Sequence, residues 1–367
     1  MEGNYNMYEL NNSFSVCFNI MKIKYNMYDQ SFDELGLIGP NDSVNVFINL
    51  ESVLHHLSTI RDLDKKLVTE TDYPIIMTAD ILNLAAHYKR FFRDNRLPTR
   101  VFLYMTDLDS TSFKESKFNE DYRSYYLTKF NDNPRYYELT NTLKSQILPD
   151  AKQICEFLPD IHLITTKNID SSVLPAVIAK KYPGSKNVIV TGDIYETQYV
   201  YYPSFGVHYI RKSPMYSSTT WTLKGFLKEI FKREPDETTE TNILRNLSFY
   251  DTMLSSFGDR PRSIDPIRRI GAISTLKLFR SALTERKLEY DTESIELIRE
   301  IFPDDAQEEI TDNFYQYSIP WKEKELTDAD IFSVDSQIVN RFDNNSLLKL
   351  NATRFYNHQL MLEELTM

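Results

Sequence analysis

SSFGDRPRSIDPIRRIGAISTLKLFRSAL, residues 255–283, predicts the end of a short helix, a tight turn, a basic hairpin and a second helix. The turn is the Gly258-Asp259 pair, and the hairpin ends at Gly271. Eight Lys or Arg residues lie between Gly258 and Lys287, against three acidic residues. A basic hairpin that presents backbone N–H groups at the start of a helix is suited to binding phosphate. An ordinary helical hairpin with a solvated basic face has the same composition, so composition alone leaves both interpretations open.

The composition of the whole chain is that of a globular protein. Its 367 residues, 41% of them apolar, are enough to bury a core in one large or two small domains. The two cysteines, Cys17 and Cys155, form neither a disulfide framework nor a zinc-binding spacing, which favours a reducing compartment. We recognise no signal peptide and no long uncharged apolar run. The sequence therefore predicts a cytoplasmic protein that has no membrane contact.

The negative charge is concentrated at the C-terminal end. The net charge is −11, and residues 289–367 contain 18 acidic and six basic residues, so the rest of the chain is nearly neutral. We interpret residues 289–367 as an acidic C-terminal extension that interacts with other proteins. Its apolar islands, at 314–321 and 331–339 among others, predict helices or strands that dock on another surface. A neutral body with a basic hairpin also keeps DNA possible as a partner.

Short apolar strands alternate with helices between residues 43 and 231. Strands are predicted at 44–48, 100–105, 162–165 and 187–190, and helices at 51–63, 79–94 and 171–181. This alternation predicts an α/β fold with a parallel sheet and helices on both faces. Ligands on such sheets bind at the carboxyl ends of the strands. Polar residues that could converge there follow four of the strands, namely Asn49, Asp107, Asp170 and Asp193.

The remaining segments divide the chain further. Residues 1–42, rich in Asn, Tyr and Met, are predicted to be an N-terminal accessory segment. Residues 110–157, which are charged and aromatic, are predicted to be helical. Residues 232–242 are charged and poor in apolar residues, which predicts a linker, and the hairpin region then occupies 243–288.

Several stretches, in this order, resemble the flap endonuclease and 5′–3′ exonuclease family. The basic hairpin is similar to the family's helix-three-turn-helix, GDxSDNIPGVPGIGPKTA, with the first Gly-Asp and the last Gly at the same separation. TGDIYETQ (191–198) is similar to the family's S-x-D-x-D-x-x-Q, and NIDSSVLP (168–175) resembles its acidic helix opening. TSFKESKFNEDYRSYY (111–126) resembles the helical arch. The resemblance spans residues 43–290 and implies a PIN/FEN-like parallel sheet flanked by helices, with an arch, a helix-three-turn-helix and a C-terminal extension.

The resemblance implies a site for two divalent ions, Mg²⁺ or Mn²⁺, held by a cluster of carboxylates. Four acidic residues are retained as candidate ligands: Asp107 (with Asp109 as the other candidate for its position), Asp170, Asp193 and Asp259. The family's acidic residues are replaced at other positions, by Asn49, Asn168, Ser171 and Tyr195. Glu51 and Glu196 are close in sequence. We do not expect them to compensate, because adjacent side chains on a strand or turn point in different directions.

Three of the four retained acids also have a structural interpretation. Asp170, before Ser171, is a suitable helix N-cap. Asp193 and Asp259 each follow a glycine, and Gly-Asp pairs are common in turns. The sequence therefore leaves a structural role and a metal-binding role open for these three residues.

Basic residues carry the predicted nucleic-acid contacts. The hairpin and its helix supply Arg260, Arg262, Arg268, Arg269, Gly271 and Lys277, and the predicted arch supplies Lys114, Lys117 and Arg123. No residue is assigned as catalytic, because the charge lost from the metal site favours a pseudoenzyme. The sequence thus favours a FEN-like nuclease fold with a degraded two-metal site, acting as a structural, assembly or DNA-binding component. A bacteriophage origin and a place in the virion are compatible with so divergent a member. The alternative is an active Mg²⁺-dependent, structure-specific 5′ nuclease.

Overall fold

A computed structural model of the chain describes residues 42–50, 73–94, 97–106, 142–156, 158, 160–167, 169–209, 227, 240–257, 270–285, 288–289 and 291–338. The predicted helix at 51–63, most of the predicted arch and the basic hairpin itself lie outside these residues. The same is true of the N-terminal segment up to residue 41.

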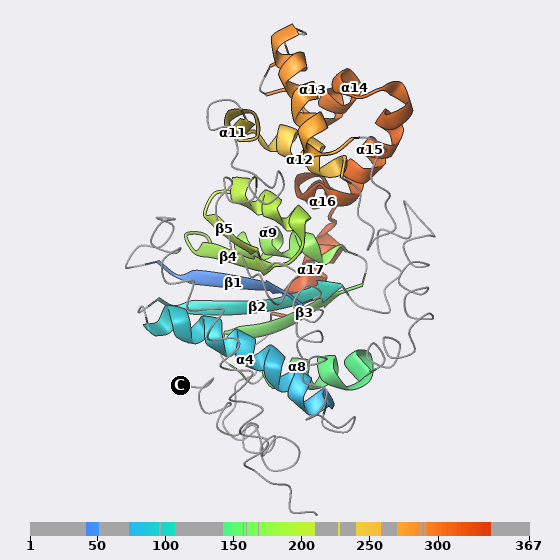
Figure 1. Cartoon of the computed structure of the whole chain (residues 1–367). Coiled ribbons are helices and arrows are strands. Elements are labelled where there is room, and N and C mark those ends of the chain that lie inside the picture. The colour runs from blue at the N-terminus through green and yellow to red at the C-terminus, as the bar shows by residue number, and fades with distance from the viewer. Residues whose placement is uncertain are drawn as a thin grey trace, which may run out of the picture.

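Five parallel strands form one sheet in the order β3-β2-β1-β4-β5 (Figure 1). They are β1 (Val44–Asn49), β2 (Thr99–Thr106), β3 (Ile161–Thr166), β4 (Lys186–Thr191) and β5 (Phe205–Tyr209). In the central strand β1, Ile48 pairs with Leu103 of β2 and with Val190 of β4. The parallel α/β sheet and its four predicted strands are therefore confirmed, and β5 is a fifth strand that the sequence did not predict.

One face of the sheet is covered by two helices. Val44, Val46 and Ile48 of β1 pack there against α4 (Tyr73–Asp94) and α8 (Leu148–Cys155). A π-helical turn, η1 (Leu143–Ile147), precedes α8. All six residues of β1 are buried, because the centre of a parallel sheet has helices on both faces.

The opposite face of the sheet is covered by shorter helical elements. Phe47, which alternates with Val46 and Ile48, packs here with residues of η2 (Ser171–Val173), α9 (Leu174–Ala179) and η3 (Ile194–Tyr201). The helix predicted at 171–181 is thus a 3₁₀ turn followed by a short α-helix. The hydroxyl of Tyr199 in η3 donates a hydrogen bond of 2.7 Å to the carbonyl of Ser172, which ties η3 to η2.

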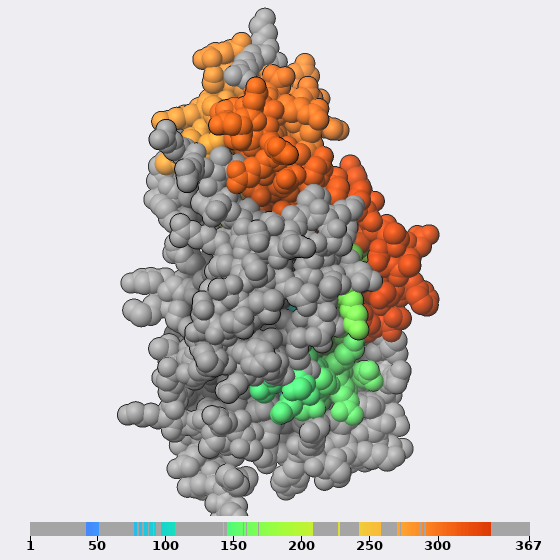
Figure 2. Space-filling view, turned by 90° about the vertical axis from the view of Figure 1, so that its right-hand side faces the viewer, coloured from blue at the N-terminus to red at the C-terminus, as the bar shows by residue number. Residues whose placement is uncertain are grey.

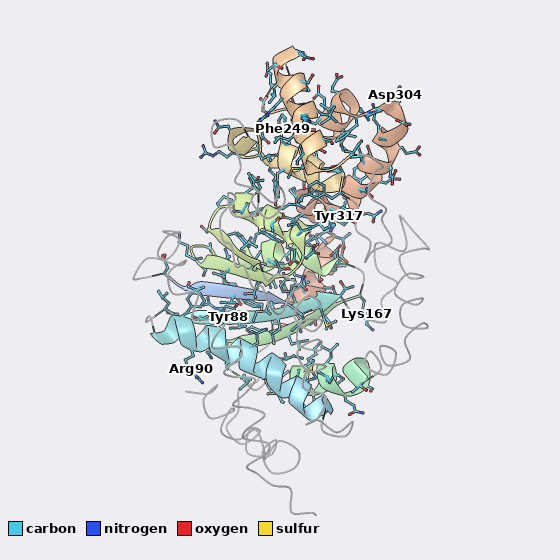
Figure 3. All side chains as sticks on the ribbon, in the orientation of Figure 1. Tyr88, Arg90, Lys167, Phe249, Asp304 and Tyr317 are labelled. Carbon is cyan, nitrogen blue, oxygen red and sulfur yellow. The ribbon has the colours of Figure 1, made fainter. Side chains whose placement is uncertain are left out.

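A second core is entirely helical and lies beyond this face (Figure 1). It consists of α11 (Glu240–Ile243), α12 (Leu247–Ser255), α13 (Ala272–Glu285), α14 (Ser294–Ile301) and α15 (Asp304–Tyr317). Phe249 of α12 packs edge-on against Phe279 of α13, with ring centroids 4.9 Å apart, and Figure 3 shows Phe249 within this cluster. The helix predicted after Gly271 is α13.

The chain then returns from the helical cluster to the sheet through α16 (Ile319–Lys324) and α17 (Asp328–Asp335). Ile319 and Val334 are buried against the sheet face that contains Phe47. The side-chain amide of Gln337 accepts a hydrogen bond from the N–H of Thr165 at 3.1 Å and donates one to its carbonyl at 2.9 Å. It thereby pairs with the edge strand β3 as a neighbouring strand would.

The apolar islands predicted at 314–321 and 331–339 therefore dock on this chain's own core. In Figure 2 the described part of the extension forms a continuous orange-to-red surface that runs from the helical cluster to the level of the sheet. Within the described ranges, no helix is long and apolar enough to cross a membrane.

Candidate functional site

Polar residues follow three strands at the carboxyl edge of the sheet. Asn49 ends β1, Asp170 follows β3, and Asp193 follows β4. This is the edge at which ligands bind in open parallel α/β sheets. The other two retained acids, Asp107 and Asp259, lie outside the described residues, as does Asn168.

Asp170 caps the first turn of η2. Its Oδ1 accepts a hydrogen bond of 3.0 Å from the backbone N–H of Ser172. The N-cap interpretation of Asp170 is therefore confirmed. Its second carboxylate oxygen, Oδ2, has a partner from a distant part of the chain.

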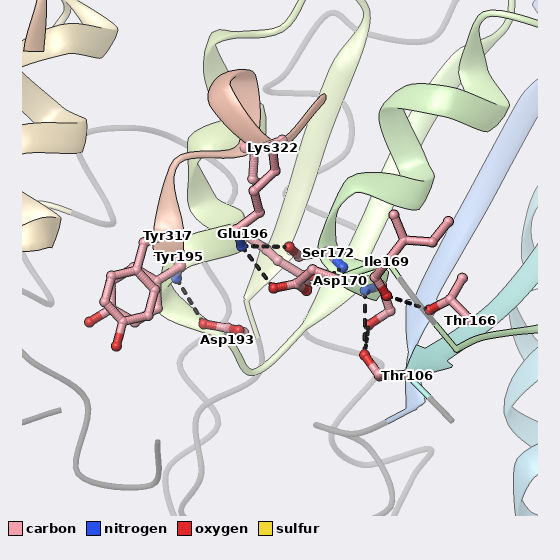
Figure 4. A network of polar contacts seen from close by, with 12 residues as sticks. Thr106, Thr166, Ile169, Asp170, Ser172, Asp193, Tyr195, Glu196, Tyr317 and Lys322 are labelled. Atoms are coloured by element: carbon pink, nitrogen blue, oxygen red, sulfur yellow. Dashed lines mark hydrogen bonds and ion pairs between the residues drawn. The ribbon is translucent and has the colours of Figure 1, made fainter. Parts of the chain in front are cut away.

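That partner is Lys322 of α16. Its Nζ donates to Asp170 Oδ2 at 2.9 Å and to Ser172 Oγ at 3.1 Å (Figure 4). Lys322 is 6% exposed and Asp170 is 5% exposed, so the ion pair is buried. The negative charge of one retained acid is therefore balanced by an ammonium group from the C-terminal extension.

Asp193 begins η3 in the same manner. Its Oδ1 accepts a hydrogen bond of 2.9 Å from the N–H of Tyr195, and its own N–H donates to Thr191 Oγ1 at 2.9 Å. These local bonds match the turn interpretation of this Gly-Asp pair. Asp193 is half-buried, in contrast to the buried Asp170.

Tyr195, for which the sequence resemblance implies an acid in the family, contacts Tyr317 of the C-terminal extension. Its ring stacks on that of Tyr317, with centroids 3.6 Å apart and an interplanar angle of 5° (Figure 4). Both rings are buried in the helical cluster. Figure 3 shows Tyr317 where that cluster meets the sheet layer. The side chain of Tyr195 therefore has a packing role in this structure.

Glu196 lies inside the site, contrary to our expectation that its side chain would point elsewhere. Its side chain is fully buried, and Tyr104 of β2 donates a hydrogen bond of 3.0 Å to its Oε1. The expectation was wrong because η3 is a 3₁₀ helix, in which residues three apart lie one above the other. Glu196 therefore lies on the same side as Asp193, three residues before it.

The environment of Glu196 favours its neutral form. Burial, and next the negative charge of Asp193, raise the pKa of the Glu196 carboxyl well above its usual range. Polar contacts with Thr191, Asn49 and Tyr104 act in the opposite direction but do not cancel this rise. In this environment, with no cation beside it, the Glu196 carboxyl is shifted towards its protonated form.

Gln198 fixes the extension over this edge. Its side-chain Nε2 donates to the carbonyl of Tyr317 at 2.9 Å, and its Oε1 accepts from the N–H of Ile319 at 3.0 Å. Between them, Ser318 Oγ donates to Asp251 Oδ2 of α12 at 2.8 Å. Burial raises the pKa of Asp251 to about 7, whereas the Ser318 hydrogen bond and the charge of Lys322 oppose the rise.

Few of the predicted nucleic-acid contacts can be located. Arg260, Arg262, Arg268, Arg269 and the arch residues Lys114, Lys117 and Arg123 lie outside the described residues. Gly271 is exposed, and a side chain there would meet nothing within 4 Å, so packing within the described chain does not require glycine. Lys277 is exposed on α13.

The described residues do not fit a pair of divalent ions. Across the part of the chain that the structure describes, no three His, Cys, Asp or Glu residues are grouped to hold a metal ion. Asp170 Oδ2 is bound by an ammonium group, and Glu196 is held towards its neutral form. Two-metal sites need several ionised carboxylates close together.

Comparison with solved structures agrees with this architecture. The T5 D15 protein co-crystallised with metal ions has a TM-score of 0.52 and 11% sequence identity, over 84% of this chain and 99% of that one. The fold is that of the flap endonucleases and 5′–3′ exonucleases. T5 5′-exonuclease with bound zinc is also similar, at a TM-score of 0.45 and 12% identity, over 88% of this chain and 97% of that one. No protein-family model and no curated protein matches the sequence.

The FEN-like fold was thus anticipated from the sequence motifs, whereas three of the residues that shape this site were not. Lys322 and Tyr317 lie in the acidic extension, more than 100 residues beyond the strands that they reach. The sequence signal for them is the apolar island at 314–321, which includes Tyr317 and ends just before Lys322. The orientation of Glu196 follows from the 3₁₀ geometry of η3, for which the sequence contains no clear signal.

Proposed function

We propose that this chain is a FEN-like nuclease-fold protein that does not cleave phosphodiesters and instead serves as a structural, assembly or DNA-binding component. The observation that supports this most strongly is the buried ion pair between Lys322 and Asp170. In a two-metal nuclease the carboxylates hold ions that contact both oxygens of the scissile phosphodiester. A carboxylate that is bound to an ammonium group and to a backbone N–H has little capacity left for this task.

Two further features support the loss of catalysis. Asn49 supplies no charge at the end of the central strand, and the ring of Tyr195 is stacked on Tyr317. The nearby carboxyl of Glu196 is buried and already accepts a hydrogen bond from the hydroxyl of Tyr104. A divalent ion at this edge would therefore meet fewer negative charges than its stable binding requires.

The surface of the extension supports a protein partner. Acidic side chains on α14 and α15 are exposed, and they are Glu296, Glu300, Asp304, Asp305, Glu308, Glu309 and Asp312. Such a surface repels the phosphate backbone and attracts a basic protein surface. We therefore propose that residues 289–367 bind another protein and that this acidic face takes part in the contact. The divergent sequence is compatible with a bacteriophage component that acts in the cytoplasm or in the virion.

DNA binding without turnover is a specific form of this proposal. The exposed Lys277 lies on the helix that follows the basic hairpin, which includes Arg268 and Arg269. Binding to phosphates through these residues would fall steeply with salt. Replacing Arg268 and Arg269 together by alanine should flatten the salt dependence. Unchanged binding of duplex ends by this double variant would exclude the hairpin as a DNA contact.

Cleavage of a 5′-flap or nicked duplex tests the loss of catalysis. The expected result is no cleavage above background in Mg²⁺ or in Mn²⁺, which tolerates poorer ligand sets. The control is Asp193→Ala, because Asp193 is the retained acid that is still half exposed. Cleavage by the natural chain that Asp193→Ala abolishes would instead establish the alternative, an active metal-dependent 5′ nuclease.

A further inference from the structure

Lys322 is buried at the carboxyl edge of the sheet although it is charged. Its side chain is 6% exposed, and that of its partner Asp170 is 5% exposed. Buried ion pairs contribute little net stability, and apolar residues of the same volume are often as good or better. Packing alone therefore does not account for a lysine at this position.

The lysine is held in place by an ordered set of contacts. Its backbone N–H donates to the carbonyl of Ser318 at 3.0 Å, one helical turn earlier. Ser318 is fixed in turn by its hydrogen bond to Asp251, and Gln198 binds the residues on either side of Ser318. Three hydrogen bonds therefore fix the segment that precedes Lys322, and they hold its ammonium group beside Asp170.

The ammonium group of Lys322 interacts with two acidic residues from separate parts of the fold. It contacts Asp170 directly, and its charge also acts on Asp251 of the helical cluster. The remaining contact, to Ser172 Oγ, adds a neutral oxygen. Oxygen atoms from a carboxylate and a hydroxyl around one positive charge are also the environment that a hard cation prefers.

We infer that the ammonium group of Lys322 substitutes for a bound cation at Asp170, so that removing it opens a site for a divalent cation. This inference rests on the proposed function, in which no divalent ion is needed at Asp170. The space vacated by the amine would be lined by Asp170 Oδ2 and Ser172 Oγ, and water would complete the coordination, as it commonly does for Mg²⁺. With a single carboxylate, the affinity for the ion should be weak.

The test is a Mn²⁺ titration of the full chain, followed by electron paramagnetic resonance of free Mn²⁺ and by the thermal unfolding midpoint. Four proteins are compared: the natural chain, Lys322→Ala, the double variant Lys322→Ala/Asp170→Asn, and Lys324→Ala. Lys324 is an exposed lysine on the same helix, so its variant controls for the loss of a positive charge alone. Mg²⁺ in place of Mn²⁺ provides a second probe for the thermal measurement.

Lys322→Ala should gain one Mn²⁺ site, and its unfolding midpoint should rise by about 2 °C at ten times the dissociation constant. The double variant, Lys324→Ala and the natural chain should show neither effect. The inference is overturned if Lys322→Ala gains no site, or if the gained site persists without Asp170. It is equally overturned if the natural chain already binds Mn²⁺ through Asp170.

Lys322→Ala could fail to fold in the absence of metal, because an unpaired buried carboxylate is strongly destabilising. The readout is then the yield of refolding with and without Mn²⁺. Mn²⁺ should rescue Lys322→Ala, whereas the double variant should fold without it, and failure of rescue counts against the inference. Cleavage by the natural chain is measured separately: flap cleavage would overturn the proposed function, and the Mn²⁺ titration alone decides this inference.

Discussion

Tyr195 stacks face to face on Tyr317, with ring centroids 3.6 Å apart and planes inclined by 5°. Tyr195 lies in the first turn of η3, the 3₁₀ helix after β4, and Tyr317 ends α15, so the stack joins the sheet layer to the helical cluster. The sequence resemblance implies an acidic residue of the FEN family at the position of Tyr195. In this chain the residue there contributes an aromatic contact to the core.

Removing one ring of this stack should destabilise the protein strongly. Tyr317 is fully buried, and loss of a buried aromatic side chain typically costs about 3–5 kcal/mol. Tyr317→Ala should therefore lower the urea midpoint well below that of Tyr317→Phe, which keeps the ring. Similar midpoints for the two variants would show that the stack contributes little.

Restoring the family's acid should not restore catalysis. Tyr195→Asp places a carboxylate in the buried position that the ring occupies against Tyr317, and burial of an unpaired charge is unfavourable. We expect a less stable protein, by about 2 kcal/mol or more, and no flap cleavage in Mn²⁺. Circular dichroism and the cleavage assay measure the two effects. Cleavage by this variant would mean that Tyr195 alone had blocked the reaction.

The Lys322–Asp170 pair should behave as a unit in a double-mutant cycle. Lys322→Met leaves a buried carboxylate unpaired and should cost about 3–5 kcal/mol. Lys322→Met combined with Asp170→Asn should recover most of this loss, because neither residue is then charged. Urea unfolding of the four proteins gives the coupling energy. Additive effects of the two substitutions would show that the two charges do not depend on each other.

The two glutamines that bind the extension should differ in importance. Gln198 is fully buried and satisfies a carbonyl and an N–H at the junction of α15 and α16, whereas Gln337 lies half-buried at the edge of β3. Gln198→Ala should cost about 2–4 kcal/mol, because two buried backbone groups lose their partners. Gln337→Ala should cost about 1 kcal/mol. Chemical denaturation of both variants checks this order, which equal losses would contradict.

Asp251 should make stability depend on pH. Burial raises its pKa from 3.8 to about 7, so the folded state holds the proton more tightly than the unfolded state does. The contribution of Asp251 to stability should therefore fall as the pH rises from about 4 to about 7 and then level off. Asp251→Asn cannot ionise, so the free energy of unfolding of this variant relative to the natural chain should increase by about 4 kcal/mol between pH 4 and pH 8.

Urea titrations across this pH range measure the difference. Asp305→Asn, at an exposed acid of α15, is the control and should leave the pH profile unchanged. A constant gap between Asp251→Asn and the natural chain across the range would show that Asp251 does not hold its proton more tightly in the folded state.

Much of the sheet could be predicted from the sequence because its signals are local. Alternating apolar residues such as Val44, Val46 and Ile48 mark a strand whichever tertiary contacts follow. Strand β5 was missed because Phe205–Tyr209 is short and includes Gly206 and His208. The N-cap at Asp170 was also predictable, because it depends only on the backbone two residues later.

The state of the site was harder to predict because it depends on contacts between distant residues. Nothing near Asp170 in the sequence indicates that Lys322, 152 residues later, will neutralise it. The orientation of Glu196 depends on the 3₁₀ geometry of η3, which places it on the same side as Asp193, three residues earlier. A strand or an ordinary turn would point this side chain in another direction. The motifs therefore indicate candidate site residues such as Asp170 and Tyr195, but not the distant residues that contact them.

The most direct test is an anomalous-scattering map from crystals of the natural chain soaked in Mn²⁺. We expect Lys322 Nζ to remain within hydrogen-bonding distance of Asp170 Oδ2, with no Mn²⁺ bound to that carboxylate. Two Mn²⁺ peaks about 4 Å apart at this edge of the sheet, with Lys322 displaced, would contradict the account.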